Sequence, residues 1–205
     1  MEYKILQVGA IGTNCYIVFD KDQNACAIID PGGHPHRIVN AVSSLGCEPV
    51  AILLTHGHYD HTDAVSALQA KWPGIPTYMN HRDAYSDNAY MLQLFPAIAD
   101  RKDYDEGDVI EVGILKLEIM ATPGHSEGSV TIRCEDTLFC GDTLFAGSMG
   151  RTDFPGGSMK KIMESLKRLA SLEGNLTVCP GHMEPSNLDR ERRTNPFVLQ
   201  ALRNN

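Results

Sequence analysis

Apolar residues recur along the chain in two spacings, which predict strands and helices. In the first half, short apolar or alternating runs bounded by turn-forming residues predict strands. These strands are expected at residues 3–10, 15–19, 26–29, 50–54 and 77–79. The run at 50–54 is apolar throughout, which is typical of a strand buried on both faces. Helices are expected at residues 38–45, closed by Gly46, and at residues 64–69, before Pro73.

The second half repeats this order of elements. Its strands are expected at residues 109–111, 114–121, 129–133, 137–140 and 177–179. An amphipathic helix is predicted at 158–172, a helical tail follows Leu188, and residues 81–95 are helical or irregular. Two similar halves favour two sheets packed face to face with helices outside. We find no repeat or linker, and we expect a single domain over residues 1–205.

Composition narrows the class of protein. The chain has 205 residues, long enough for a sizeable core, and a formal net charge of -8. The densest basic run is residues 190–193, which is short for a nucleic-acid footprint, so we expect no nucleic-acid partner. No apolar run reaches the length of a transmembrane helix, and the six cysteines include no CxxC pair. A cytoplasmic protein with reduced, buried cysteines is therefore expected.

Histidine and aspartate are concentrated directly after the apolar run that ends at Leu54. His56, His58, Asp60 and His61 fall within six residues. Alternate residues of an extended loop share a side, so we expect His56 and His58 to face one point. Asp60 and His61 can then reach a second point nearby. Imidazole nitrogens and carboxylate oxygens suit Zn, Fe or Mn, and a metal site is therefore preferred over a polar loop with satisfied histidines.

Three more polar residues follow the ends of other predicted strands. They are His125, Asp142 and His182, and each is preceded by a glycine, which permits a sharp backbone turn. Taken singly, each favours a structural role. Together with the cluster at residues 56–61 they complete a set of seven candidate metal ligands, so the metal interpretation gains weight.

The strings that carry these residues resemble one family. They are Thr-His-Gly-His-Tyr-Asp-His at 55–61, Pro-Gly-His-Ser-Glu-Gly-Ser at 123–129, Gly-Asp-Thr-Leu-Phe at 141–145 and Pro-Gly-His at 180–182. Their order and separations resemble the metallo-β-lactamase superfamily, and the resemblance covers nearly the whole chain. It implies an α+β fold, an αβ/βα four-layer sandwich with metals at one edge of its sheets.

The resemblance also implies a ligand assignment by position. The first metal would be held by His56, His58 and His125. The second would be held by Asp60, His61 and His182. Asp142 would bridge the two, and two divalent ions, most simply Zn with Fe or Mn as alternatives, are the expected cofactors.

The bridging aspartate bears on the subclass, because true β-lactamases of this fold typically lack it. The stretch 141–157 is similar to the short, single-domain type II glyoxalases, the hydroxyacylglutathione hydrolase-like proteins. It is less closely similar to persulfide dioxygenases. This implies hydrolysis of a small-molecule thioester of the S-lactoylglutathione type by a hydroxide held at the metals. Larger type II glyoxalases have a further helical domain that supplies much of the glutathione site. No such domain is expected here, so the identity of the substrate's thiol half is left open.

Further roles follow from the chemistry of the candidate residues. Asp60 and Asp142 are the expected catalytic residues, with Asp60 orienting the nucleophile. Arg151 is the best candidate to bind a substrate carboxylate, since guanidinium binds carboxylate bidentately; an ion pair with Asp153 is the alternative. Phe154 is expected to cover the site, and Asp30 either orients a ligand histidine or serves the turn that follows it.

Other functions stay open on the sequence alone. They are a mononuclear iron persulfide dioxygenase using His56 or His58 with His125 and Asp142, a lactone, ester or phosphoester hydrolase, and a non-catalytic metal-binding module. One iron per chain would favour the oxygenase, and two metals the hydrolase. Loop, helix-start or solvated positions are expected for His34, His36 and His81, and the oligomeric state is left open.

Overall fold

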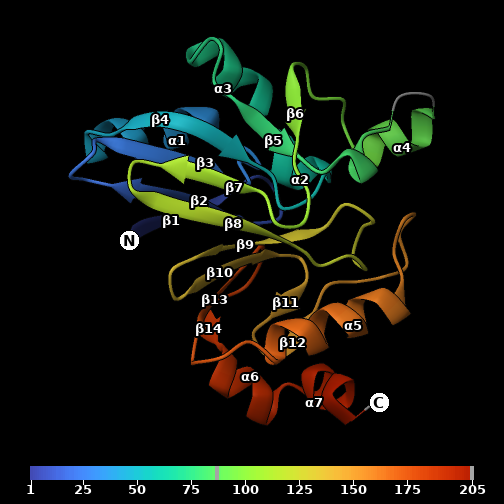
Figure 1. Ribbon diagram of the computed structural model, residues 1–205. Coiled ribbons are helices and arrows are strands. Elements are labelled where there is room, and N and C mark those ends of the chain that lie inside the picture. Colours follow the sequence, from blue (N-terminus) through green and yellow to red (C-terminus); the bar gives the residue numbers. More distant parts are fainter. Residues whose placement is uncertain (86–87, 204–205) are drawn as a thin grey trace.

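The first half of the chain builds one mixed sheet. The computed structural model describes residues 1–85 and 88–203. Six strands form this sheet in chain order: β1 (Glu2–Val8), β2 (Thr13–Asp20), β3 (Ala25–Ile29), β4 (Glu48–Leu53), β5 (Thr77–Met79) and β6 (Arg101–Asp103). The first three strands are antiparallel, and β3 to β6 run parallel to one another (Figure 1).

The second half builds another six-stranded sheet. Its order is β14 (Ser186–Asn187), β13 (Thr177–Pro180), β10 (Thr137–Gly141), β9 (Val130–Cys134), β8 (Leu115–Ala121) and β7 (Val109–Val112). β10 and β13 are parallel, and the other neighbours are antiparallel. A small ribbon joins β11 (Leu144–Phe145) to β12 (Ser148–Met149).

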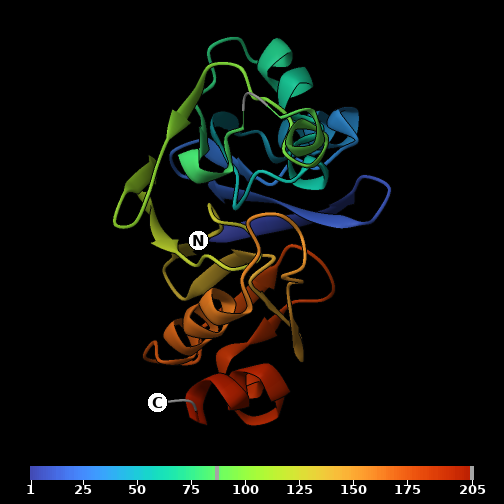
Figure 2. The same cartoon turned by 90° about the vertical axis from the view of Figure 1, so that its right-hand side faces the viewer.

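Helices cover the outer face of each sheet. The first-half helices are α1 (Pro35–Leu45), α2 (Tyr59–Thr62), α3 (Val65–Lys71), the 3₁₀ helix η1 (His81–Asp83) and α4 (Ala89–Leu94). The second sheet is covered by α5 (Met159–Ala170), α6 (Leu188–Thr194) and α7 (Pro196–Arg203). The two views show helices, sheet, sheet and helices stacked in that order (Figures 1 and 2). The predicted four-layer α+β sandwich is confirmed.

Strand β2 shows why the layers stack this way. Every residue in it is buried, and successive side chains point to opposite faces. Cys15 and Ile17 enter the core beneath α1 and α3, whereas Tyr16 and Val18 enter the core between the two sheets. The Tyr16 hydroxyl donates to the carbonyl of Pro180, 2.7 Å away, and this bond ties the first sheet to the end of β13. Residues of both sheets thus share one core, as a single domain requires. The extent of that domain, residues 1–205, stays a prediction.

Several short strands were not predicted. β6 consists of three charged residues, so it has no apolar pattern, and only its parallel pairing with β5 makes it a strand. β11, β12 and β14 have two residues each, too few to show a period. The expectation that the strand at 50–54 is buried on both faces fails at its start, where Val50 is 39% exposed. Part of the segment at 81–95, residues 86–87, lies outside the described residues.

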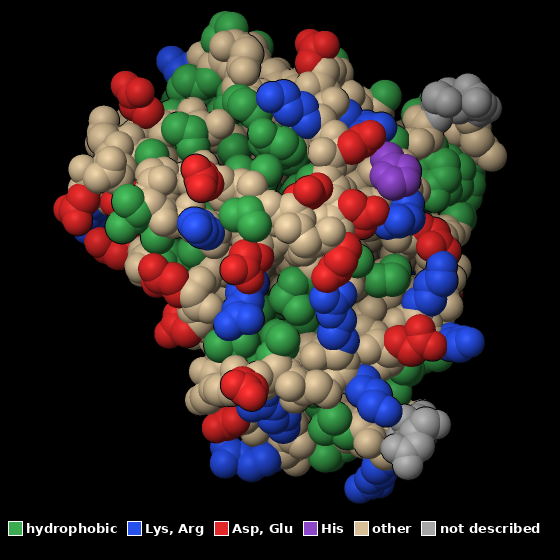
Figure 3. Space-filling view, viewed as in Figure 1, with side chains coloured by type: hydrophobic (Ala, Val, Ile, Leu, Met, Phe, Trp, Pro, Cys, Tyr) green, Lys and Arg blue, Asp and Glu red, His purple; other side chains and the backbone are tan. Residues whose placement is uncertain are grey.

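The state of the cysteines and the distribution of surface charge agree with what the composition predicted. All six cysteines are free and buried, as small apolar residues are. Acidic and basic side chains are interspersed on the face shown in Figure 3. None of the helices in the described part of the chain is long and apolar enough to cross a membrane.

Candidate metal centre

Strand ends from both sheets place the seven candidate ligands together. β4 ends at Leu53, and the loop after it carries His56 and His58 into the short helix α2, which contains Asp60 and His61. The remaining three follow β8, β10 and β13 of the second sheet, and they are His125, Asp142 and His182. These four strands all end on the same side of the sandwich. The site therefore lies at one edge of the sandwich, where the ends of strands from both sheets come together.

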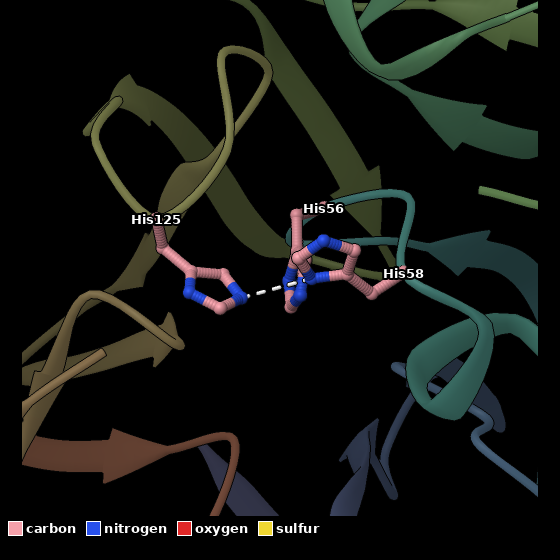
Figure 4. Close-up of side chains that lie close together, drawn as sticks. All are labelled: His56, His58 and His125. Atoms are coloured by element: carbon pink, nitrogen blue, oxygen red, sulfur yellow. Dashed lines mark hydrogen bonds between the residues drawn. The ribbon is translucent and has the colours of Figure 1, made fainter. Parts of the chain in front are cut away.

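One group of three histidines faces a common point. His56, His58 and His125 are each at least 96% buried, and each offers a ring nitrogen within 4.8 Å of the other two. Nδ1 of His58 lies 2.9 Å from Nε2 of His125. Figure 4 shows the three rings converging from two loops of opposite halves of the chain. The arrangement is the one expected of three ligands to one ion.

A second group lies beside the first. Nε2 of His182 lies 3.1 Å from Oδ2 of Asp60, and Nε2 of His61 lies 3.3 Å from the same oxygen. The ligand atoms of Asp60, His61 and His182 are mutually within 4.8 Å. Thr13 also donates to this oxygen of Asp60 from 3.1 Å, which fixes the carboxylate.

Asp142 lies between the two groups. Its Oδ1 is 3.4 Å from Nε2 of His61, and its Oδ2 is 3.6 Å from Nε2 of His125 and 3.5 Å from Nε2 of His182. One carboxylate thus faces the first group through His125 and the second through His61 and His182. This is the position that a bridging ligand needs.

Unsatisfied polar atoms test whether the cluster fits metal ions. Buried polar atoms normally have hydrogen-bond partners. Among the described residues, four buried side-chain atoms lack one, and all lie here: Nε2 of His56, Nε2 of His58, Nε2 of His61 and Oδ1 of Asp142. These are nitrogen and oxygen donors of the kind that Zn, Fe and Mn accept, so the cluster fits divalent ions.

The protonation states also suit metal binding at most positions. Burial, together with His125 and His61, lowers the pKa of His58 to about 3, so its ring is neutral near pH 7. Burial raises the pKa of Asp142, but His61 and His125 outweigh it and leave that pKa below its ordinary value. His61 differs: burial lowers its pKa, but Asp30 and Asp142 outweigh burial and raise it well above the ordinary value.

Asp30 orients His61 and also shapes the backbone. Its Oδ2 lies 3.0 Å from Nδ1 of His61, which directs the other ring nitrogen into the cluster. The same carboxylate accepts bonds from the backbone N–H and hydroxyl of Thr55, at 2.7 and 2.6 Å. Asp30 has a φ of 51°, so the two roles considered for it, orienting a ligand histidine and serving a turn, are both present.

The family model for the metallo-beta-lactamase superfamily matches residues 8–182, which include all seven candidate ligands. The chain belongs to this superfamily. Two relatives match almost end to end. A probable metallo-hydrolase YqgX of Bacillus subtilis is 36% identical, covering 97% of this chain and 98% of its own. Hydroxyacylglutathione hydrolase GloC of Haemophilus influenzae is 31% identical with the same coverage, 97% and 98%.

Two solved structures share the fold. BLEG-1, described as a B3 metallo-beta-lactamase, superposes with a TM-score of 0.85 at 30% identity, covering 96% of this chain and 99% of its own. TTHA1623, solved in a di-iron-bound form, superposes with a TM-score of 0.80 at 32% identity, covering 95% and 99%. The superfamily, the fold and a metal-binding His/Asp cluster are therefore shown for this chain.

The cluster forms the floor of an open cavity of about 590 Å³. Phe154, expected to cover the site, lines this cavity, and its ring centroid lies 5.9 Å from that of His58. Arg151 also lines it, but Nε and a terminal nitrogen of its guanidinium donate to Asp153 over 2.7 and 2.6 Å. The ion pair considered as the alternative is thus formed, and carboxylate binding by Arg151 stays a prediction that requires Asp153 to be displaced.

The other histidines lie away from the cluster. His34 precedes α1 in a left-handed conformation, and its Nδ1 accepts from the backbone N–H of Gly9. His36 is exposed within α1, and His81 is exposed at the start of η1. These positions agree with the structural or solvated roles expected for them.

Asp83 is a contributor that the sequence analysis missed. It is 1% exposed and lies in η1, yet its carboxylate accepts from Gly57, Gly128 and Ser126 at 3.0, 2.7 and 2.6 Å. Gly57 separates two candidate ligands, and Ser126 follows a third, His125. A Cβ at Gly57 or Gly128 would lie 2.9 or 2.7 Å from atoms of Asp83, so both positions need glycine. The pair of glycines beside the ligands was the available signal.

Asp83→Asn is expected to weaken metal binding about tenfold. The amide keeps the shape of the carboxylate but points an N–H group at a backbone N–H, so the two ligand loops lose a shared anchor, at about 1–3 kcal/mol of stability. Zn²⁺ competition with a chromophoric chelator measures the affinity. Asp20→Asn is the control, because Asp20 accepts from three backbone N–H groups far from the cluster. It should lower the melting temperature and leave Zn²⁺ affinity unchanged; equal Zn²⁺ affinities for both variants would contradict the role of Asp83.

Proposed function

We propose that this chain is a binuclear metal-dependent hydrolase that cleaves thioesters of the hydroxyacylglutathione type. One observation carries the proposal: Asp142 faces two adjacent groups of three ligands at the floor of an open cavity. The match to hydroxyacylglutathione hydrolase GloC supports the substrate class. Zn is the proposed metal, and the di-iron form of TTHA1623 keeps Fe as the alternative.

Two ions bound here would polarise a substrate carbonyl and lower the pKa of a shared water. The chain's own residues supply the rest. Burial raises the pKa of Asp60, but the nearby His182 and His61 outweigh burial and hold that pKa below its ordinary value. The carboxylate therefore stays ionised and can accept a hydrogen bond from water, which orients the nucleophile. Phe154 lines one side of the cavity, where its ring can shield a bound substrate from solvent. A thiol leaves as a thiolate, so a thioester needs no strong general acid.

Metal-loaded protein is expected to hydrolyse S-lactoylglutathione with a kcat/KM at least about tenfold above that for a lactone, a phosphodiester or a cephalosporin. The thioester absorbance and matched chromogenic assays give the four rates at one metal content. The cephalosporin belongs in this set because BLEG-1 is described as a metallo-beta-lactamase. Faster cleavage of any of the other three would reassign the substrate class while leaving the metal centre in place.

Zn²⁺ binding to the metal-free protein at pH 7 is expected to release about one proton from His61. The sign follows from the raised pKa of His61: without metal its ring is protonated at neutral pH, and a ligand must be unprotonated. Affinity should therefore weaken about tenfold for each pH unit below that pKa. An indicator in weakly buffered solution measures the release, with exposed His36→Asn as the control. No release, or release unchanged in His61→Ala, would contradict the assignment.

A further inference from the structure

Beyond the ligands, the cavity at the cluster is lined mainly by apolar side chains. They include Ile11, Tyr59, Leu94, Phe145, Phe154 and Met183. Three of them are unusually exposed for large apolar residues: Ile11 is 56% exposed, Tyr59 47% and Met183 49%. Large apolar side chains that gather around a functional cavity indicate a surface that is covered by a ligand.

These three exposed residues, Ile11, Tyr59 and Met183, form the rim of the cavity, and two of them lie beside candidate ligands in the chain. Ile11 lies in the turn between β1 and β2, Tyr59 begins α2, and Met183 follows His182 directly. Met183 has a φ of 69°, a left-handed conformation that non-glycine residues rarely adopt. Its carbonyl accepts from Nδ2 of Asn14, 2.8 Å away, which fixes this conformation. The fold thus maintains an unfavourable backbone geometry where an apolar side chain meets the cavity.

The lining of the cavity has few basic side chains. Among the described residues, Arg151 is the one lysine or arginine that lines it. Its guanidinium is engaged by Asp153 and lies over the Phe154 ring, 3.8 Å from the centroid. The whole chain has a net charge of -8. A glutathione thioester carries two carboxylates. Apart from the two metal ions, where the reacting carbonyl would lie, the lining offers these carboxylates only Arg151, whose charge Asp153 compensates.

We propose that the cavity binds an uncharged, apolar thiol half of the thioester, an aryl or alkyl thiol rather than a peptide thiol. The inference rests on the proposed thioester hydrolysis and revises one half of its substrate: the hydroxyacyl half stays, and an apolar thiol takes the place of glutathione as the preferred thiol half. A lactoyl group at the cluster is too small to fill a cavity of about 590 Å³, so the thiol half lies along the apolar rim. Hydrolysis forms a C–O bond from water and breaks the C–S bond, releasing a carboxylic acid and the apolar thiol.

Lactoyl thioesters of three thiols test this proposal: glutathione, N-acetylcysteamine and 2-phenylethanethiol. Each kcat/KM is divided by the rate constant for hydrolysis of the same ester by hydroxide, which removes the difference in leaving-group reactivity. The phenylethyl ester is expected to exceed the glutathione ester about tenfold, mainly through a lower KM. Equal values, or a preference for the glutathione ester, would overturn the proposal.

A charge placed on the rim gives a second, matched test. Met183→Lys keeps an unbranched side chain at the same backbone position and adds a cation. It is expected to lower the preference for the phenylethyl ester over the glutathione ester at least about fivefold. Ile114→Lys is the control, because Ile114 is 75% exposed at the turn between β7 and β8, away from the cavity. An unchanged preference in Met183→Lys, with an unchanged melting temperature, would overturn the proposal.

Binding of the free thiols separates this inference from the proposed function. Calorimetry with metal-loaded protein compares 2-phenylethanethiol with glutathione, and neither measurement requires turnover. Tighter binding of 2-phenylethanethiol without hydrolysis of any thioester would support the apolar cavity and refute the thioesterase. Tighter binding of glutathione, with thioester hydrolysis intact, would refute the apolar cavity and leave the thioesterase standing.

Discussion

Asp142→Ala is expected to strip metal from both sites and to lower kcat/KM by at least about a thousandfold, or 4 kcal/mol of transition-state stabilisation. The reason is geometric. The carboxylate faces His61 from one oxygen and His125 and His182 from the other, so its removal takes a ligand from both groups at once. Elemental analysis gives the metal content and steady-state kinetics the rate, both at the same protein concentration.

The control for this substitution is Asp136→Ala. Asp136 is exposed in the turn between β9 and β10, away from the cluster, and its loss should change neither metal content nor rate. The melting temperature of metal-free Asp142→Ala shows whether the fold survives. Two metals per chain and unreduced activity in Asp142→Ala would refute the bridging role.

His58→Ala and His61→Ala are expected to lose about one metal each, from different sites, with kcat/KM falling at least about a hundredfold in both. His58 faces His56 and His125, whereas His61 faces Asp60 and His182. The losses should therefore be complementary. Co²⁺ substitution makes this visible, because each variant should show the absorption of one remaining site and the two spectra should differ.

His36→Ala is the control for both histidines, because His36 is exposed within α1 and should retain two metals. His61 carries an additional cost. It is fully buried beside Asp30, so the alanine leaves a cavity and a buried carboxylate with one partner fewer. A greater loss of stability is thus expected for His61→Ala than for His58→Ala. Loss of both metals from each variant would mean that the two groups form one indivisible site.

The site could be predicted from the sequence largely because several of its candidate ligands lie close together in the sequence and all of them follow the ends of strands. Residues 56–61 supply four of them, and the end of a strand in a layered fold is where side chains from distant segments meet. The glycines before His125 and Asp142 were expected to permit sharp turns, and both have a positive φ, 136° at Gly124 and 48° at Gly141. Glycine before His182 has a different purpose: a Cβ at Gly181 would lie 2.2 Å from Oδ1 of Asp142.

What the sequence did not reveal depends on long-range contacts. Asp83 has no neighbouring motif, and its importance comes from three bonds to segments 26 to 45 residues away. Strand β6 likewise has no apolar signal of its own and exists through its pairing with β5. Local pattern predicts local structure, and these features are not local.

Stepwise reconstitution of the metal-free protein with metal ions shows whether hydrolysis requires two metals per chain. S-lactoylglutathione hydrolysis is measured as Zn²⁺, and separately Fe²⁺, is added from zero to three equivalents per chain. We expect no activity without metal and a rise in activity that ends at two equivalents, with His36→Ala following the same curve. Activity in the metal-free protein, or full function with one iron per chain and oxygen consumption on a persulfide, would contradict this expectation.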